Sequence, residues 1–144
     1  MFFKKILVPY DGSKNANRAF EKALDMAKNT NTKIKIITCI FRGHGTDMAY
    51  ETRFVDLFDV ELEKEALSKI NKLGTLAKKS GVHVDGAVVK TLDAAQKIAD
   101  FAKKEKSDLI ILGSHGRSGF AKMVLGSVSN GVLSKASCPV MIVQ

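Results

Sequence analysis

A chain of 144 residues, 45% of them hydrophobic and 26% charged, is long enough for one domain with its own core and too short for two ordinary ones. No apolar stretch approaches the roughly 18 residues that span a bilayer, and the first residues lack the order of a signal peptide, so we expect a cytoplasmic protein. The net charge is +8, but lysines scattered over every predicted helix, without an arginine-rich patch, favour a solvated surface over a nucleic-acid face.

The first third of the chain predicts a strand, a turn, a helix and a second strand. Residues 3–9 carry Ile6-Leu7-Val8, and such a run without alternation is typical of a strand buried on both faces of a parallel sheet. Ser13 ends the following turn and is a suitable N-cap for an amphipathic helix that runs to about Asn29. The second strand is predicted over 33–40, where early lysines mark a more exposed start.

Apolar residues three to four positions apart predict a long helix, in one piece or two, over about 47–79. Gly81 is a reasonable residue to end it. The aromatic cluster of Tyr50, Phe54 and Phe58 is more typical of a core or dimer surface than of a ligand wall. The third strand is predicted over 82–89, and Gly86 inside it indicates a bulge or a close approach of another backbone.

The last third predicts a helix, a strand, a second helix and a final strand. Asp93 caps a helix that ends near Glu105, and residues 109–112 form the fourth strand. A final helix starts at Ser127, and its predicted apolar positions are Val128, Val132, Leu133 and Ala136. A short apolar strand follows over 140–143. Alternating strands and helices indicate right-handed βαβ units, hence an α/β fold with a parallel sheet and helices on both faces, in a single domain over 1–144.

The fourth strand leads into a pattern that suits an anion. It ends in Gly113-x-x-Gly116, and Gly126 opens the next helix. Glycine lets a backbone approach an anion closely, while the first turn of a helix offers unpaired N–H donors and the positive end of its dipole. Ser127 and Ser129 can add hydroxyl donors, so the pattern predicts a phosphate cradle.

The spacing Gly113-x2-Gly116-x9-Gly126-Ser127 resembles the nucleotide-binding signature of the ATP-binding branch of the universal stress protein family. The opening segment 4–13 and the closing segment 137–143 resemble the family as well, so the resemblance covers nearly the whole chain. The family usually has a glycine in the turn before the third helix, where this chain has Thr91-Leu92-Asp93. The resemblance implies a Rossmann-like, doubly wound sheet of five parallel strands in the order 3-2-1-4-5. In that order the loops after strands 1 and 4 diverge and leave a crevice at their carboxyl ends.

The resemblance also implies the roles of individual residues toward an adenine nucleotide. Asp11 is expected to accept hydrogen bonds from ribose or adenine, and the alternative for it is an Asx-turn or helix-start residue. Backbone atoms around Pro9, Cys39 and Leu112 are expected to flank the base. Ribose and phosphates are expected to be held by the N–H groups of Gly113, Gly116, Gly126, Ser127, Val128 and Ser129. Any Mg²⁺ would be held mainly by the phosphates.

Other polar residues near the cradle are less specific. Arg117 and Lys122 suit phosphate neutralisation and a solvated loop equally well. His115 is better explained as a satisfied or exposed histidine than as a catalytic one, because no nucleophile elbow presents a serine beside it. The histidines lack metal-ligand spacing. Cys39 and Cys138 are expected to stay reduced, on opposite edges of the sheet.

Three functions are compatible with these patterns. The first is an adenine-nucleotide-binding (ATP, ADP or AMP) stress-response protein that acts as a ligand-dependent dimeric regulator. The second is a slow ATPase or phosphotransferase, disfavoured because a Walker lysine motif is absent from the sequence. The third is a nucleic-acid or protein-interaction module. A homodimer is expected in each case, because the apolar segment 139–144 would lie at a sheet edge, and the family pairs this strand antiparallel across a two-fold axis.

Overall fold

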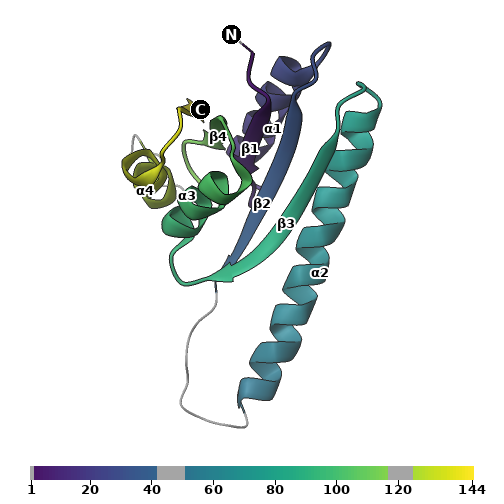
Figure 1. Cartoon of the computed structure of the whole chain (residues 1–144). Coiled ribbons are helices and arrows are strands. Elements are labelled where there is room, and N and C mark those ends of the chain that lie inside the picture. The colour runs from purple at the N-terminus through teal and green to yellow at the C-terminus, as the bar shows by residue number, and fades with distance from the viewer. Residues whose placement is uncertain (1, 42–50, 117–124) are drawn as a thin grey trace.

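The computed structural model describes residues 2–41, 51–116 and 125–144, with the backbone alone for 51–58. It confirms the predicted architecture: one five-stranded parallel sheet in the order β3-β2-β1-β4-β5. The chain alternates strands and helices (Figure 1) as β1 Lys5–Pro9, α1 Lys14–Ala27, β2 Lys33–Phe41, α2 Glu51–Lys78, β3 Val84–Thr91, α3 Ala94–Glu105, β4 Leu109–Gly113, α4 Ser127–Lys135 and β5 Val140–Val143. None of the described helices is both long enough and apolar enough to cross a membrane.

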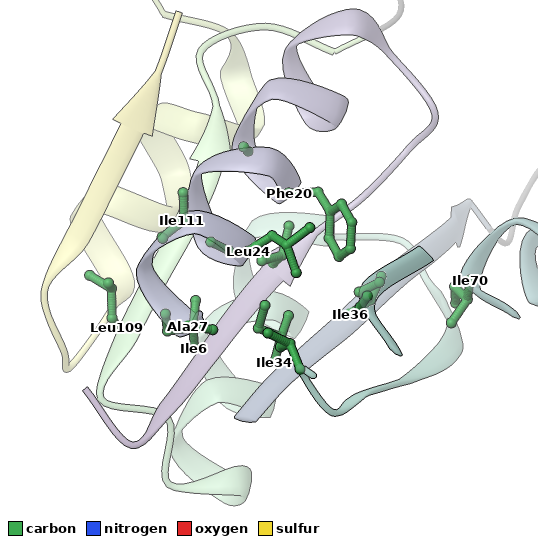
Figure 2. Close-up of a cluster of buried hydrophobic side chains, with 14 residues drawn as sticks. Ile6, Phe20, Leu24, Ala27, Ile34, Ile36, Ile70, Leu109 and Ile111 are labelled. Atoms are coloured by element: carbon green, nitrogen blue, oxygen red, sulfur yellow. The ribbon is translucent and has the colours of Figure 1, made fainter. Parts of the chain in front are cut away.

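The central strand β1 is buried on both faces, as its unbroken apolar run predicts. Ile6 and Val8 contribute to the hydrophobic layer that α1 and α2 cover, and Leu7, which points the other way, contributes to the layer under α3 and α4. Figure 2 shows the first layer, where Phe20 and Leu24 of α1 pack over strand residues. The two layers fix the sheet between two pairs of helices, and so they fix the carboxyl ends of the strands.

The third strand lies two residues later than predicted. Val82 was assigned to it, but its N–H donates to the Ala77 carbonyl (3.1 Å), so Val82 belongs to the turn that ends α2. Gly86 pairs with Ile36 in an unbroken register, which rules out a bulge there. A Cβ on Gly86 would lie 2.7 Å from Cγ2 of Ile70 on α2. The space beside Gly86 is thus filled by a side chain of α2, and the backbone atom nearest to that Cβ is the Ile36 carbonyl oxygen of the paired strand at 3.0 Å. Helix α2 is one continuous helix.

The predicted apolar side of α4 is only partly correct. Val132 is fully buried, but Val128 and Leu133 are 39% and 43% exposed. The reason is the contact with α3: Gly131 faces Ala95 so closely that a Cβ there would collide with the Ala95 methyl group. This orientation turns Ser129 into the interior in place of the two larger side chains.

The two cysteines are not on opposite edges of the sheet. Cys39 lies on β2, one strand in from the β3 edge, while Cys138 precedes the edge strand β5. Both are free thiols that pack at the margin of the same hydrophobic layer under α3 and α4.

Candidate functional site

A cavity of about 470 Å³ opens at the carboxyl ends of the strands. Because β1 and β4 are neighbours in the sheet, the turns that follow them lie on either side of this cavity, at the point where the winding reverses. Its size is that of a small-molecule site. Every residue that the sequence predicted for the site lines it: Pro9, Asp11, Cys39, Leu112, Gly113, Gly116, Gly126, Ser127, Val128 and Ser129.

The turn after β1 is held by hydrogen bonds to its own side chains. Gly12 has φ +81°, a conformation that glycine adopts without strain. Oδ1 of Asp11 accepts the Ser13 N–H (2.9 Å), which forms the Asx-turn that the sequence left open. Ser13 in turn caps α1, because its Oγ accepts the Ala16 N–H (3.1 Å). Asp11 thus has a turn role and lines the cavity as well.

The Gly113-x-x-Gly116 turn packs tightly against the α1 side of the cavity. A Cβ on Gly113 would lie 2.7 Å from Cβ and 2.8 Å from the carbonyl carbon of Asn15. A Cβ on Gly116 would lie 2.7 Å from Oδ2 of Asp11. Gly113 is therefore required by space, because the Asn15 atoms belong to or adjoin the α1 backbone, whereas Gly116 meets only the end of the Asp11 side chain. The motifs after β1 and β4 are in direct contact.

The first turn of α4 forms another part of the cavity wall. Gly126 is its N-cap, and no side chain among the described residues caps the helix. The N–H groups of Ser127, Val128 and Ser129 precede the first possible intrahelical hydrogen bond, which the Asn130 N–H makes to the Gly126 carbonyl (3.0 Å). Three donors and the positive end of the helix dipole therefore lie at the cavity wall.

Two predicted donors are committed elsewhere. The Gly126 N–H donates to the Ser114 carbonyl (2.7 Å), and the buried Ser129 hydroxyl donates to the Gly113 carbonyl (2.8 Å). The expectation that these two groups donate to an anion is wrong for this structure. The physical reason is that α4 starts directly against the end of β4, so both groups satisfy backbone carbonyls there.

Sequence reasoning missed the apolar wall of the cavity, which consists of Ile37, Ala94 and Ile98. Ile37 could have been found from strand alternation, because it lies two residues before Cys39 on the same face of β2. Ala94 and Ile98 carry no motif, and they reach the cavity through the position of α3. The remaining lining residues that were not assigned to the site are Tyr10, Ser13, Ala16 and His115.

His115 lines the cavity and contacts Ser114, but Ser114 does not line the cavity. Its Nδ1 is 3.1 Å from Oγ of the adjacent Ser114, which is buried. Its carbonyl accepts a hydrogen bond from the Asn15 carboxamide (3.3 Å). The candidates Arg117 and Lys122, His44 and the aromatic cluster lie outside the residues whose side chains the structure describes.

Cys39 is the cavity residue whose ionisation the surroundings change most clearly. Burial raises the pKa of the Cys39 thiol to about 11, against a smaller opposing effect of Lys97, so this thiol is neutral at pH 7. Among the described residues no three acidic, histidine or cysteine side chains are grouped as metal ligands.

Comparison with known proteins places this geometry in a family. The family model described as the universal stress protein family matches residues 2–144. Universal stress protein YxiE of Bacillus subtilis is 31% identical over 148 residues, covering 99% of both chains. Universal stress protein A homolog 2 of Coxiella burnetii is 35% identical over 144 residues, covering 99% of this chain and 95% of the relative.

Solved structures share the fold. The hypothetical protein MJ0577 superposes with a TM-score of 0.87 and 26% identity, over 99% of this chain and 96% of that one. A universal stress protein from Archaeoglobus fulgidus, solved in complex with dAMP, has a TM-score of 0.70 and 22% identity, with both chains fully covered. Another universal stress protein, solved in complex with cAMP, has a TM-score of 0.68 and 23% identity, over 100% of this chain and 98% of that one.

Proposed function

The chain belongs to the universal stress protein family, and we propose that it binds an adenine nucleotide (ATP, ADP or AMP). In this proposal it is a cytoplasmic stress-response protein that acts as a ligand-dependent dimeric regulator. The observation that carries the proposal is the cavity itself, which residues of both halves of the nucleotide signature line. The dAMP and cAMP complexes of proteins with the same fold support an adenine nucleotide as the ligand class.

The chemistry of the cavity suits the two ends of such a ligand. The apolar wall of Ile37, Ala94 and Ile98 suits a purine, which gains from burial of its flat faces. The N–H groups at the start of α4 suit phosphates, because they are donors at the positive end of a helix dipole. Asp11 suits a ribose hydroxyl, and Mg²⁺ would be held by the phosphates themselves.

The regulatory part of the proposal rests on β5. This strand lies at the edge of the sheet, and its four residues, all apolar, are only partly buried. An exposed apolar edge is normally paired or covered, and antiparallel pairing with a second copy would satisfy it. Nucleotide binding at the end of the neighbouring strand β4 would then bias the dimer that partner proteins recognise.

Isothermal titration of the purified chain with ATP, ADP and AMP tests nucleotide binding. Gly126→Asp should weaken binding strongly, because it places a carboxylate beside the phosphate position, whereas Ser134→Asp, on the exposed side of the same helix, should bind as the parent does. Absence of heat and of thermal stabilisation at millimolar nucleotide would end the proposal.

Mass in solution, measured by small-angle scattering with and without nucleotide, tests the dimer. A monomeric mass in both conditions would exclude the dimeric regulator while leaving nucleotide binding intact. Salt-sensitive binding of DNA that Gly126→Asp leaves unchanged would instead favour a nucleic-acid module.

A further inference from the structure

Three consecutive backbone carbonyls at the end of β4 all accept hydrogen bonds. Ser129 is only 3% exposed, and its hydroxyl donates to the Gly113 carbonyl at 2.8 Å and lies 3.1 Å from the Ser114 carbonyl. The Ser114 carbonyl also accepts the Gly126 N–H at 2.7 Å. Each of these acceptors is therefore paired with a group from the start of α4.

The third carbonyl is paired from the opposite side of the cavity. The carboxamide of Asn15, in the first turn of α1, donates to the His115 carbonyl at 3.3 Å. The Asn15 backbone also fills the space beside Gly113. Helices α1 and α4, which are distant in sequence, thus bind the same short turn from two directions.

These hydrogen bonds change what the cavity offers to an anion. A carbonyl oxygen carries a partial negative charge and would repel a phosphate placed nearby, more strongly in a partly desolvated cavity than in water. A donor on that oxygen offsets its charge and fixes its orientation, while the N–H groups of Ser127, Val128 and Ser129 keep no intrahelical acceptor. The local balance then favours negative ligands.

We propose that Ser129 and Asn15 are specificity-determining positioning residues, which pair the Gly113 and His115 carbonyls and thereby give the cavity its preference for phosphate-bearing ligands over an uncharged nucleoside. This inference rests on the proposed function, since it concerns the same cavity. A merely structural role would differ in one respect: it would weaken nucleoside and nucleotide binding alike.

The test compares ADP with adenosine in the full-length chain by isothermal titration. The variants are Ser129→Ala and Asn15→Ala, and the matched control is Ser134→Ala. Ser134 lies on the same helix as Ser129, and its exposed hydroxyl donates to the Asn130 carbonyl (3.0 Å). Circular dichroism and thermal melting establish that each variant folds. Asn15→Ala, which removes a half-buried side chain, tests the inference if Ser129→Ala does not fold.

The measured quantity is the preference, the dissociation constant of adenosine divided by that of ADP. Ser129→Ala should lower this preference about tenfold and Asn15→Ala severalfold, with adenosine affinity within about twofold of the parent. The control should leave it unchanged. An unchanged preference in both variants, or an equal loss of both affinities, would overturn the inference alone. A parent chain that binds neither ligand would overturn the proposed function and this inference with it.

Discussion

Replacement of Gly113 by alanine is the most direct test of how the cradle is packed. The added Cβ would lie 2.7 Å, 2.8 Å and 3.0 Å from the Cβ, carbonyl carbon and carbonyl oxygen of Asn15. These atoms belong to or adjoin the α1 backbone and cannot rotate away. To restore the usual carbon–carbon separation of about 3.5–4.0 Å, the turn and α1 must move apart by about 1 Å.

The energetic consequence follows from overpacking. Forcing a methyl group into a filled space costs about 2 kcal/mol, which for a chain of this size lowers the melting temperature by about 6–8 °C. The same displacement moves the donors of the cradle, so ADP affinity should fall at least about tenfold. Gly74→Ala is the control, because its Cβ would make an ordinary contact of 3.6 Å with the Val84 carbonyl.

Urea unfolding, thermal melting and ADP titration of the two variants give the answer. Gly74→Ala lies within α2 and should be neutral or stabilising by up to about 1 kcal/mol, with ADP affinity unchanged. If Gly113→Ala were as stable as the parent and bound ADP equally well, the tight packing of α1 against the turn would be refuted.

Three further changes probe the fold around the cavity. Gly131→Ala should destabilise the chain by about 1–3 kcal/mol through its collision with Ala95, and the double variant with Ala95→Gly should recover most of that loss in urea unfolding. Burial raises the pKa of the Cys39 thiol from 9.0 to about 11, so the thiol of the unfolded chain ionises first as pH rises. The free energy of unfolding should therefore fall by about 2 kcal/mol between pH 9 and 11 because of this thiol. Cys39→Ala should lack this part of the decrease. Ser13→Ala removes the acceptor for the Ala16 N–H and should cost about 1 kcal/mol by thermal melting; no change would mean that the cap contributes nothing.

The order of the elements could be predicted because its signals are local. Unbroken apolar runs such as Ile6-Leu7-Val8 identify buried parallel strands, and residues such as Ser13 and Asp93 identify helix starts, each of which accepts the expected N–H bond in the structure. The strand order came from the resemblance to a family and not from the patterns themselves. Local signals could not place Val82, because its hydrogen bond to Ala77 depends on how α2 ends.

The position of the candidate site could be predicted from sequence, but the state of its donors could not. Glycine spacing identifies where a backbone can approach an anion, and the cavity forms there. Whether the Gly126 N–H and the Ser129 hydroxyl face that cavity depends on the distance between α4 and β4, which no residue pattern encodes. The apolar wall from α3 was missed for the same reason, since Ile98 reaches the cavity only through helix placement.

The proposed binding role of Asp11 is compatible with its turn role. A carboxylate has two oxygens, and here Oδ1 accepts the Ser13 N–H while Oδ2 is the atom that a Cβ on Gly116 would meet. The turn bond holds the side chain in one orientation before any ligand arrives, so little rotamer entropy remains to be lost on binding. The hydrogen bond that makes Asp11 an ordinary turn residue is thus also what fixes its carboxylate at the contact between the two motifs.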